Sequence, residues 1–141
     1  MNKQKAKPIT IRAVREDESA GWSSTKKQLL YEPKHPITLM HELGHLILGH
    51  KETKSARRFL IQEIEAVKFV HSRGEILDLD ELYAAANQAY WIGSLSFSSI
   101  LREFKDRGIH ISRETLRSKL KEGFFFPVGA IEKLEALDYE V

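Results

Sequence analysis

The chain opens with short alternating segments, and helical periodicities follow them. Residues 9–15 alternate apolar and polar side chains and are rich in β-branched residues, which predicts a strand. Residues 27–32 predict a second short strand, and the polar segment 16–25 between the two predicts a turn or loop. Two prolines, Pro33 and Pro36, then mark the passage from this β part to a helical part.

From about residue 37 the apolar positions recur every three to four residues. This spacing predicts a helix that begins near Pro36 and ends at Gly49, and its apolar stripe consists of Leu39, Leu43, Leu46 and Ile47. The same spacing predicts a second helix over about residues 55–71. An alanine-rich third helix is predicted over about residues 80–92.

Three shorter helices are predicted after residue 96. The first carries apolar residues at i, i+3, i+4 and i+7 from Phe97 and ends at Gly108. The second follows Ser112, a good N-cap, and ends at Gly123. The last can open at Pro127. A small sheet followed by helices indicates an α+β fold.

Composition is that of an ordinary soluble protein. The chain has 141 residues, 42% apolar and 30% charged, which is enough for one compact domain with or without a small appendage. The net charge of +2 does not by itself suggest a nucleic-acid-binding protein. The sequence shows neither a secretory signal nor a membrane span, so we expect a cytoplasmic protein without a membrane partner. Because cysteine is absent, any metal must be held by His, Asp or Glu.

The first predicted helix carries the sequence His41-Glu42-Leu43-Gly44-His45. Four residues are just over one turn, so both imidazoles project from one face and can converge on one ion. Glu42 then lies beside the ion, where its carboxylate can take a proton from water at the metal. Both histidines lie on or near the buried stripe, where unpartnered polar groups are costly, and this favours a zinc site over chance.

A catalytic zinc site needs a third protein ligand and leaves the fourth position to water. Glu63 and Glu65 on the second predicted helix both qualify. Glu65 has Ile61 and Phe69 four residues before and after it, whereas Glu63 shares a face with Val67. Periodicity therefore does not choose between the two carboxylates.

His50 follows Gly49 at the end of the first predicted helix. It comes five residues after His45, which places it about 140° further round the helix, so it is a poor ligand for the same ion. We expect His50 to cap the helix or to support a ligand.

Two stretches resemble the ImmA/IrrE family of metallopeptidase-like proteins. Residues 41–50 read His-Glu-Leu-Gly-His-Leu-Ile-Leu-Gly-His, and residues 63–70 read Glu-Ile-Glu-Ala-Val-Lys-Phe-Val. In that family the second helix carries a Glu-Ala-x-x-Phe-Ala-like pattern whose glutamate completes the zinc site. Glu65, Ala66 and Phe69 match this pattern, so the resemblance implies Glu65 as the third ligand.

The resemblance covers about residues 9–72 and implies a zincin-like helical core in which His41, His45 and Glu65 hold Zn²⁺ and Glu42 is catalytic. It departs from the family at residues 73–76, where Arg-Gly-Glu-Ile replaces a Leu-Leu-Met-Pro-like segment, which affects the wall of the substrate cleft. A weaker similarity is to the zincin-like domain of ArdC-type antirestriction proteins. We expect a metallopeptidase domain over residues 1–93 and a helical region over residues 94–141.

The helical region suggests a second kind of partner. The link at residues 107–112 resembles the turn of a helix-turn-helix motif. The helix after it displays residues that could read a major groove, namely Arg113, Thr115, Arg117 and Lys119. Acidic residues nearby dilute this basic patch. DNA binding through residues 97–137 is therefore an alternative to a solvated helix that merely covers the core.

The sequence predicts a zinc-dependent metallopeptidase. The resemblance implies a regulatory protease that acts on a specific protein, such as a transcriptional repressor. The alternative is a DNA-binding regulator with a structural or sensory zinc site and no turnover. The first hypothesis predicts that Glu42→Gln keeps zinc and abolishes activity, whereas the second predicts little effect.

Overall fold

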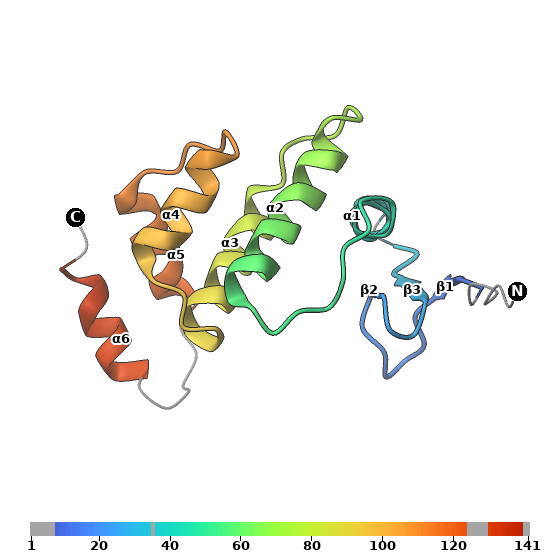
Figure 1. Cartoon of the computed structure of the whole chain (residues 1–141), viewed down its shortest axis with the longest axis horizontal. Helices are drawn as coiled ribbons and strands as arrows, with labels where there is room; N and C mark the ends of the chain where they lie inside the picture. The colour runs from blue at the N-terminus through green and yellow to red at the C-terminus, as the bar shows by residue number, and fades with distance from the viewer. Residues whose placement is uncertain (1–7, 35, 124–129, 140–141) are drawn as a thin grey trace, which may run out of the picture.

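The computed structural model describes residues 8–34, 36–123 and 130–139. Within these ranges it holds a three-stranded sheet and six α-helices, which confirms the α+β class. The elements follow one another along the long axis of the molecule (Figure 1). The sheet and α1 lie at one end, α2 and α3 in the middle, and the last helices at the other end.

The sheet has the order β1-β3-β2. Strands β1 (Thr10–Ala13) and β3 (Gln28–Tyr31) lie within the two predicted strands, and they pair in parallel. Strand β2 (Gly21–Ser23) pairs antiparallel with β3 on its other side. This third strand lies in the segment that was expected to be a loop, so that prediction was wrong. Three residues are too few to show an alternating pattern.

The two helices that follow the sheet agree with the sequence prediction. Helix α1 spans Pro36–Ile47 and α2 spans Ala56–His71. The side chain of Ser55 caps α2 by accepting a hydrogen bond from the backbone N–H of Arg58. No helix among the described residues is long and apolar enough to cross a membrane.

Helix α3 spans Leu79–Asn87, and the chain continues it as a π-helical turn, η1 (Gln88–Ile92). Helices α4 (Phe97–Asp106) and α5 (Arg113–Glu122) begin after the serine N-caps Ser96 and Ser112. Helix α6 spans Ala130–Leu137, and Pro127, which was expected to open it, lies outside the described residues.

One hydrophobic core joins α2 to the helices after it. Its fully buried members include Leu60, Ile64, Leu82, Trp91, Phe97, Phe104, Leu116, Leu120 and Leu137. Trp91 also donates a hydrogen bond from its ring nitrogen to the carbonyl of Leu120 at 2.9 Å. The boundary expected between residues 93 and 94 thus passes through a shared core. The sheet and α1 adjoin this bundle through α2.

Candidate metal centre

Helix α1 brings its two motif histidines onto one face. His41 and His45 are each only 7% exposed. Their rings meet edge to face, and their Nε2 atoms lie 3.1 Å apart. The expected helical spacing therefore places two ring nitrogens side by side.

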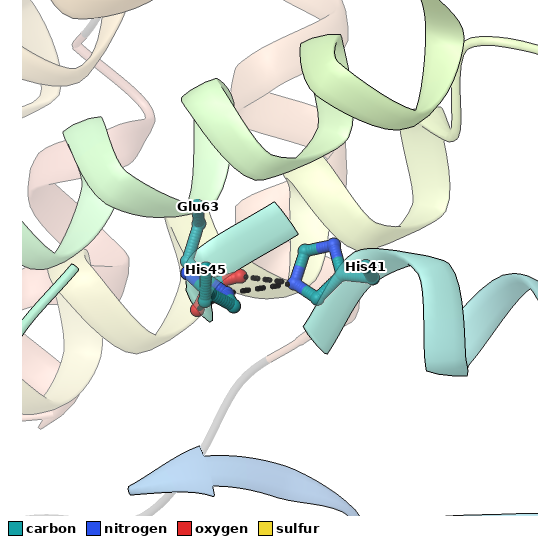
Figure 2. Close-up of side chains that lie close together, drawn as sticks. All are labelled: His41, His45 and Glu63. Carbon is teal, nitrogen blue, oxygen red and sulfur yellow. Dashed lines mark hydrogen bonds and ion pairs between the residues drawn. The ribbon is translucent and has the colours of Figure 1, made fainter. Parts of the chain in front are cut away.

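Helix α2 adds the carboxylate of Glu63 (Figure 2). Its Oε2 lies 2.8 Å from His41 Nε2, and its Oε1 lies 3.2 Å from His45 Nε2. A tetrahedral ion with bonds of about 2.0–2.1 Å separates its ligand atoms by about 3.3 Å. The three residues therefore form a group that could hold a metal ion, because their donor atoms already lie at nearly that spacing.

Glu65, the residue that the family resemblance implied, does not join this group. Two successive steps along a helix place Glu63 and Glu65 about 200° apart, so only one of them can face α1. The Glu65 side chain is 45% exposed and its Oε2 contacts His50 Nε2 at 3.5 Å, whereas the Glu63 side chain is 16% exposed. The expectation of Glu65 as the third donor is therefore corrected to Glu63.

The correction follows from how α1 and α2 meet. A Cβ atom on Gly44 would lie 3.1 Å from Phe69 Cδ1 and 3.5 Å from the carbonyl oxygen of Ala66. Glycine on α1 and alanine on α2 thus allow the two backbones to come close. Ala66 is three residues after Glu63 and shares its face, so the small residues indicate which side of α2 turns toward the histidines.

We predict that Gly44→Val separates the two helices. The added side chain must displace Phe69 or the α2 backbone, which costs about 1–3 kcal/mol of stability and moves Glu63 away from the histidines. Zinc affinity should fall at least tenfold in a chelator competition, and urea unfolding should report the loss of stability. The control is Gly21→Val, because a Cβ on Gly21 meets no atom within 4 Å. Equal zinc affinity in the Gly44 variant and the wild type would contradict this account.

His41 and Glu63 hold each other in their charged forms. Burial raises the pKa of Glu63, but hydrogen bonds and charge from His41 and His45 outweigh it and hold the pKa at about 2. Burial lowers the pKa of His41, but the hydrogen bond and charge of Glu63 outweigh it and raise the pKa above its usual value. Without a metal, a proton on His41 supplies the positive charge that this carboxylate attracts.

Glu42 lies beside the group rather than in it. It lines a pocket of about 490 Å³ together with His45, Glu63 and Trp22. Burial raises the pKa of Glu42, and the nearby histidines and the backbone N–H of Trp22 only partly oppose this rise. A half-buried carboxylate with a raised pKa is a better proton acceptor than a free glutamate.

A further carboxylate, Glu81, had no signal in the sequence. It lies in the first turn of α3, and its backbone N–H donates a hydrogen bond to the N-cap residue Asp78. An acidic residue at this place in a helix is usually solvated, so its position in the sequence offered no reason to single it out. Its Oε1 nevertheless lies 3.8 Å from His41 Nε2, and burial raises its pKa. The cluster thus receives acidic side chains from three helices.

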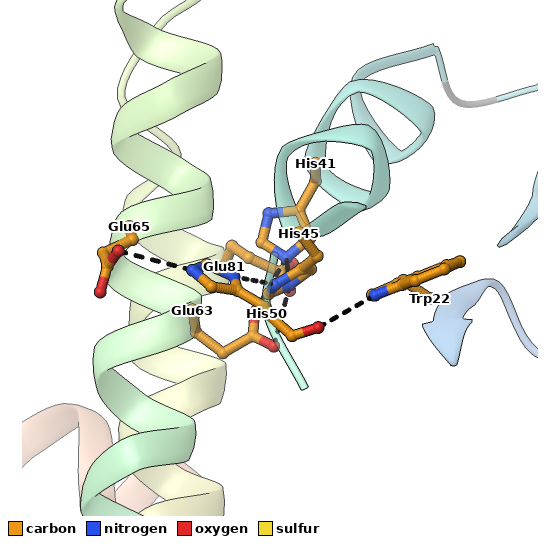
Figure 3. Close-up of polar contacts among 7 residues, drawn as sticks. All are labelled: Trp22, His41, His45, His50, Glu63, Glu65 and Glu81. Atoms are coloured by element: carbon orange, nitrogen blue, oxygen red, sulfur yellow. Dashed lines mark hydrogen bonds and ion pairs between the residues drawn. The ribbon is translucent and has the colours of Figure 1, made fainter. Parts of the chain in front are cut away.

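His50 contacts the cluster from the end of α1 (Figure 3). Its Nδ1 lies 2.8 Å from Nδ1 of His45, on the side of that ring away from Glu63. Burial and the charge of His45 lower the pKa of His50. As expected, His50 lies beside a candidate ligand and outside the candidate donor set.

The residues considered for DNA binding lie on α5 and on the link before it. Six residues, 107–112, link α4 to α5, whereas a helix-turn-helix motif uses a turn of about three to four. Thr115 is exposed, and the Arg113 guanidinium lies 5.9 Å from the centre of the Phe97 ring. DNA binding by residues 97–137 stays a prediction that these contacts do not test.

Comparisons with known proteins add no further constraint. The resemblance to ImmA/IrrE proteins therefore rests on the residues quoted above, and any functional argument rests on the geometry of the cluster. The chain matches no family model, no curated protein and no solved structure.

Proposed function

We propose that the chain is a zinc-dependent peptidase whose ion is held by His41, His45 and Glu63. The observation that carries this proposal is the convergence of three donor groups, 2.8–3.2 Å apart, beside the half-buried carboxylate of Glu42. Two imidazoles and one carboxylate are a ligand set of hydrolytic zinc sites, and they leave a fourth position for water.

Each side chain has a distinct task in this mechanism. Zinc, when bound, acts as a Lewis acid that acidifies water and polarises a carbonyl group. Glu42 takes a proton from the attacking water and returns it to the departing amine. Burial disfavours the charged form of Glu42, and this favours its uptake of the proton. Glu63 would bind the ion as a carboxylate, and even without a metal its hydrogen bonds to the two histidines hold its pKa at about 2.

The sheet suggests why the substrate is a peptide. Ala20, Gly21 and Trp22, in and beside β2, line the same pocket as Glu42. Among the described strands, β2 pairs with β3 alone, so no strand lies along its other edge. A peptide can bind such an edge through backbone hydrogen bonds, which would lay a scissile bond beside Glu42. The family resemblance extends the proposal to a specific protein substrate, such as a transcriptional repressor.

The test of this proposal is cleavage of peptide bonds. Zinc-loaded protein is incubated with a peptide library prepared from unfolded proteins, and new N-termini are identified by mass spectrometry. Chelator-treated protein is the control. We expect cleavage products only with zinc. A zinc-loaded protein that yields no products from the library and none from candidate repressors would overturn the peptidase proposal.

Zinc affinity should fall as the solution becomes more acidic. His41 must lose its proton before it can bind a metal, and its pKa is raised above the ordinary value of 6.5. Protons should therefore begin to compete with zinc at a pH above 6.5 and compete more strongly below it. Chelator competition between pH 8 and pH 5.5 measures this, with circular dichroism to show that the protein stays folded. An affinity that is constant down to pH 6 would contradict the prediction.

A further inference from the structure

We propose that His50 is a positioning residue that holds the zinc ligand His45 in place through a hydrogen bond between their Nδ1 atoms, with Glu65 as the outer acceptor. This inference rests on the proposed zinc site. It gives a role to His50 and Glu65, which the proposed catalytic mechanism does not use.

The end of α1 explains how His50 reaches His45. Gly49 has a φ of +72°, which favours glycine, and its N–H donates to the carbonyl of Leu46 at 3.2 Å. The N–H of His50 donates to the carbonyl of His45 at 2.9 Å. These two bonds form a Schellman motif, in which the side chain after the glycine folds back over the last turn. Two residues that would lie about 140° apart on a continuous helix are thereby brought into contact.

His50 is also fixed from the side of the sheet. The ring N–H of Trp22 donates to the His50 carbonyl at 3.1 Å (Figure 3). The His50 residue is 9% exposed, so each of its ring nitrogens needs a partner inside the protein. Nδ1 contacts His45 at 2.8 Å, and Nε2 contacts Glu65 at 3.5 Å.

The two ring contacts determine where the protons lie when zinc is bound. Nε2 of His45 faces His41 and Glu63, so it is the nitrogen available to the ion, and Nδ1 keeps its proton. That proton is donated to Nδ1 of His50, which must then be unprotonated. His50 carries its own proton on Nε2, directed at the carboxylate of Glu65.

Such a chain orients the ligand ring and makes it more basic, and loss of this support typically lowers metal affinity about 10- to 100-fold. The contact with Glu65 is longer and half exposed, so its removal should cost less than tenfold. Glu65 thus supports the site from outside the donor set, although the family resemblance implied it as a ligand.

Two substitutions at position 50 separate the hydrogen bond from simple packing. His50→Asn keeps an amide oxygen near the position of Nδ1, whereas His50→Leu fills similar space without an acceptor. Glu65→Gln tests the outer contact, and Glu114→Gln, at an exposed position of α5, is the control. Zinc affinity is measured by chelator competition. Imidazole proton–nitrogen NMR of histidine-labelled, zinc-loaded protein reports the His45 Nδ1 proton.

We expect a slowly exchanging His45 Nδ1 proton in the wild type, a similar one in His50→Asn and none in His50→Leu. Zinc affinity should fall 10- to 100-fold in His50→Leu and less than tenfold in His50→Asn and Glu65→Gln. Unchanged affinity and an unchanged His45 resonance in His50→Leu would overturn the positioning role and leave the zinc site intact. Should His50→Leu fail to fold, a His50→Asn variant that loses both the resonance and more than tenfold in affinity would overturn it. A wild-type protein that binds no zinc would overturn both proposals.

Discussion

Replacing Glu42 with glutamine is expected to slow peptide-bond hydrolysis about 10²- to 10⁴-fold while zinc binding is retained. Glutamine has nearly the same shape but cannot accept the proton of the attacking water. Because Glu42 lies outside the group of His41, His45 and Glu63, the donor set should be unaffected. The positive charge of zinc will lower the pKa of Glu42 below its metal-free value, so the carboxylate is ionised when it is needed.

Cleavage of a peptide found in the library experiment is the measurement, with zinc content determined on the same samples. Glu52→Gln is the matched control, since Glu52 lines the same pocket and its carboxylate accepts a hydrogen bond from the hydroxyl of Ser23 on β2. Turnover within tenfold of the wild type in zinc-loaded Glu42→Gln would contradict the assigned role. It would favour a structural or sensory zinc site, as in a DNA-binding regulator.

Removing both arginines that contact Glu103 is expected to lower the free energy of unfolding by about 3–5 kcal/mol. The Glu103 side chain is only 2% exposed. It accepts a hydrogen bond from Arg57 on α2 at 2.7 Å and another from Arg107 at the end of α4. In Arg57→Met/Arg107→Met similar apolar bulk remains, but the buried carboxylate has lost both of its cationic partners.

The opposite change should be much milder. Glu103→Met removes the buried charge, and the two arginines, whose side chains are 64% and 26% exposed, can turn to water. A loss of less than about 2 kcal/mol is expected, because replacing a buried ion by an apolar side chain can be close to neutral. Urea unfolding of both variants measures the difference. An arginine double variant no less stable than Glu103→Met would contradict this asymmetry.

The ion pair between Arg57 and Glu103 also helps to position the candidate metal centre. Arg57 precedes Glu63 by less than two turns on α2 and ties that helix to α4. Helix α2 contributes Leu60 and Ile64 to the shared core and Glu63 to the candidate metal centre. A rigid α2 keeps the Glu63 carboxylate at a fixed height against α1, which a metal site requires.

The sequence predicted the helices well because their ends carry local signals. Ser55 and Ser112 were recognisable as N-caps or helix starts, and Gly49 as a helix end, and all three have these roles in the structure. The His41 and His45 pair could also be predicted, since a spacing of four on a helix fixes two side chains on one face whatever packs against them.

The third donor depended on information that periodicity does not contain. Both Glu63 and Glu65 have apolar neighbours, and the choice between them is made by the rotation of α2 against α1. The close approach at Gly44 and Ala66 sets that rotation. Glu81 was missed for a related reason, since only tertiary packing brings α3 to His41.

The zinc content of three purified proteins tests the central claim most directly. Wild type, Glu63→Ala and Glu65→Ala are supplied with zinc, freed of excess ion and measured for metal per chain. We predict about one zinc in the wild type and in Glu65→Ala, and almost none in Glu63→Ala. Zinc retained in Glu63→Ala but lost in Glu65→Ala, or absent from the wild type, would contradict the claim that His41, His45 and Glu63 hold the ion.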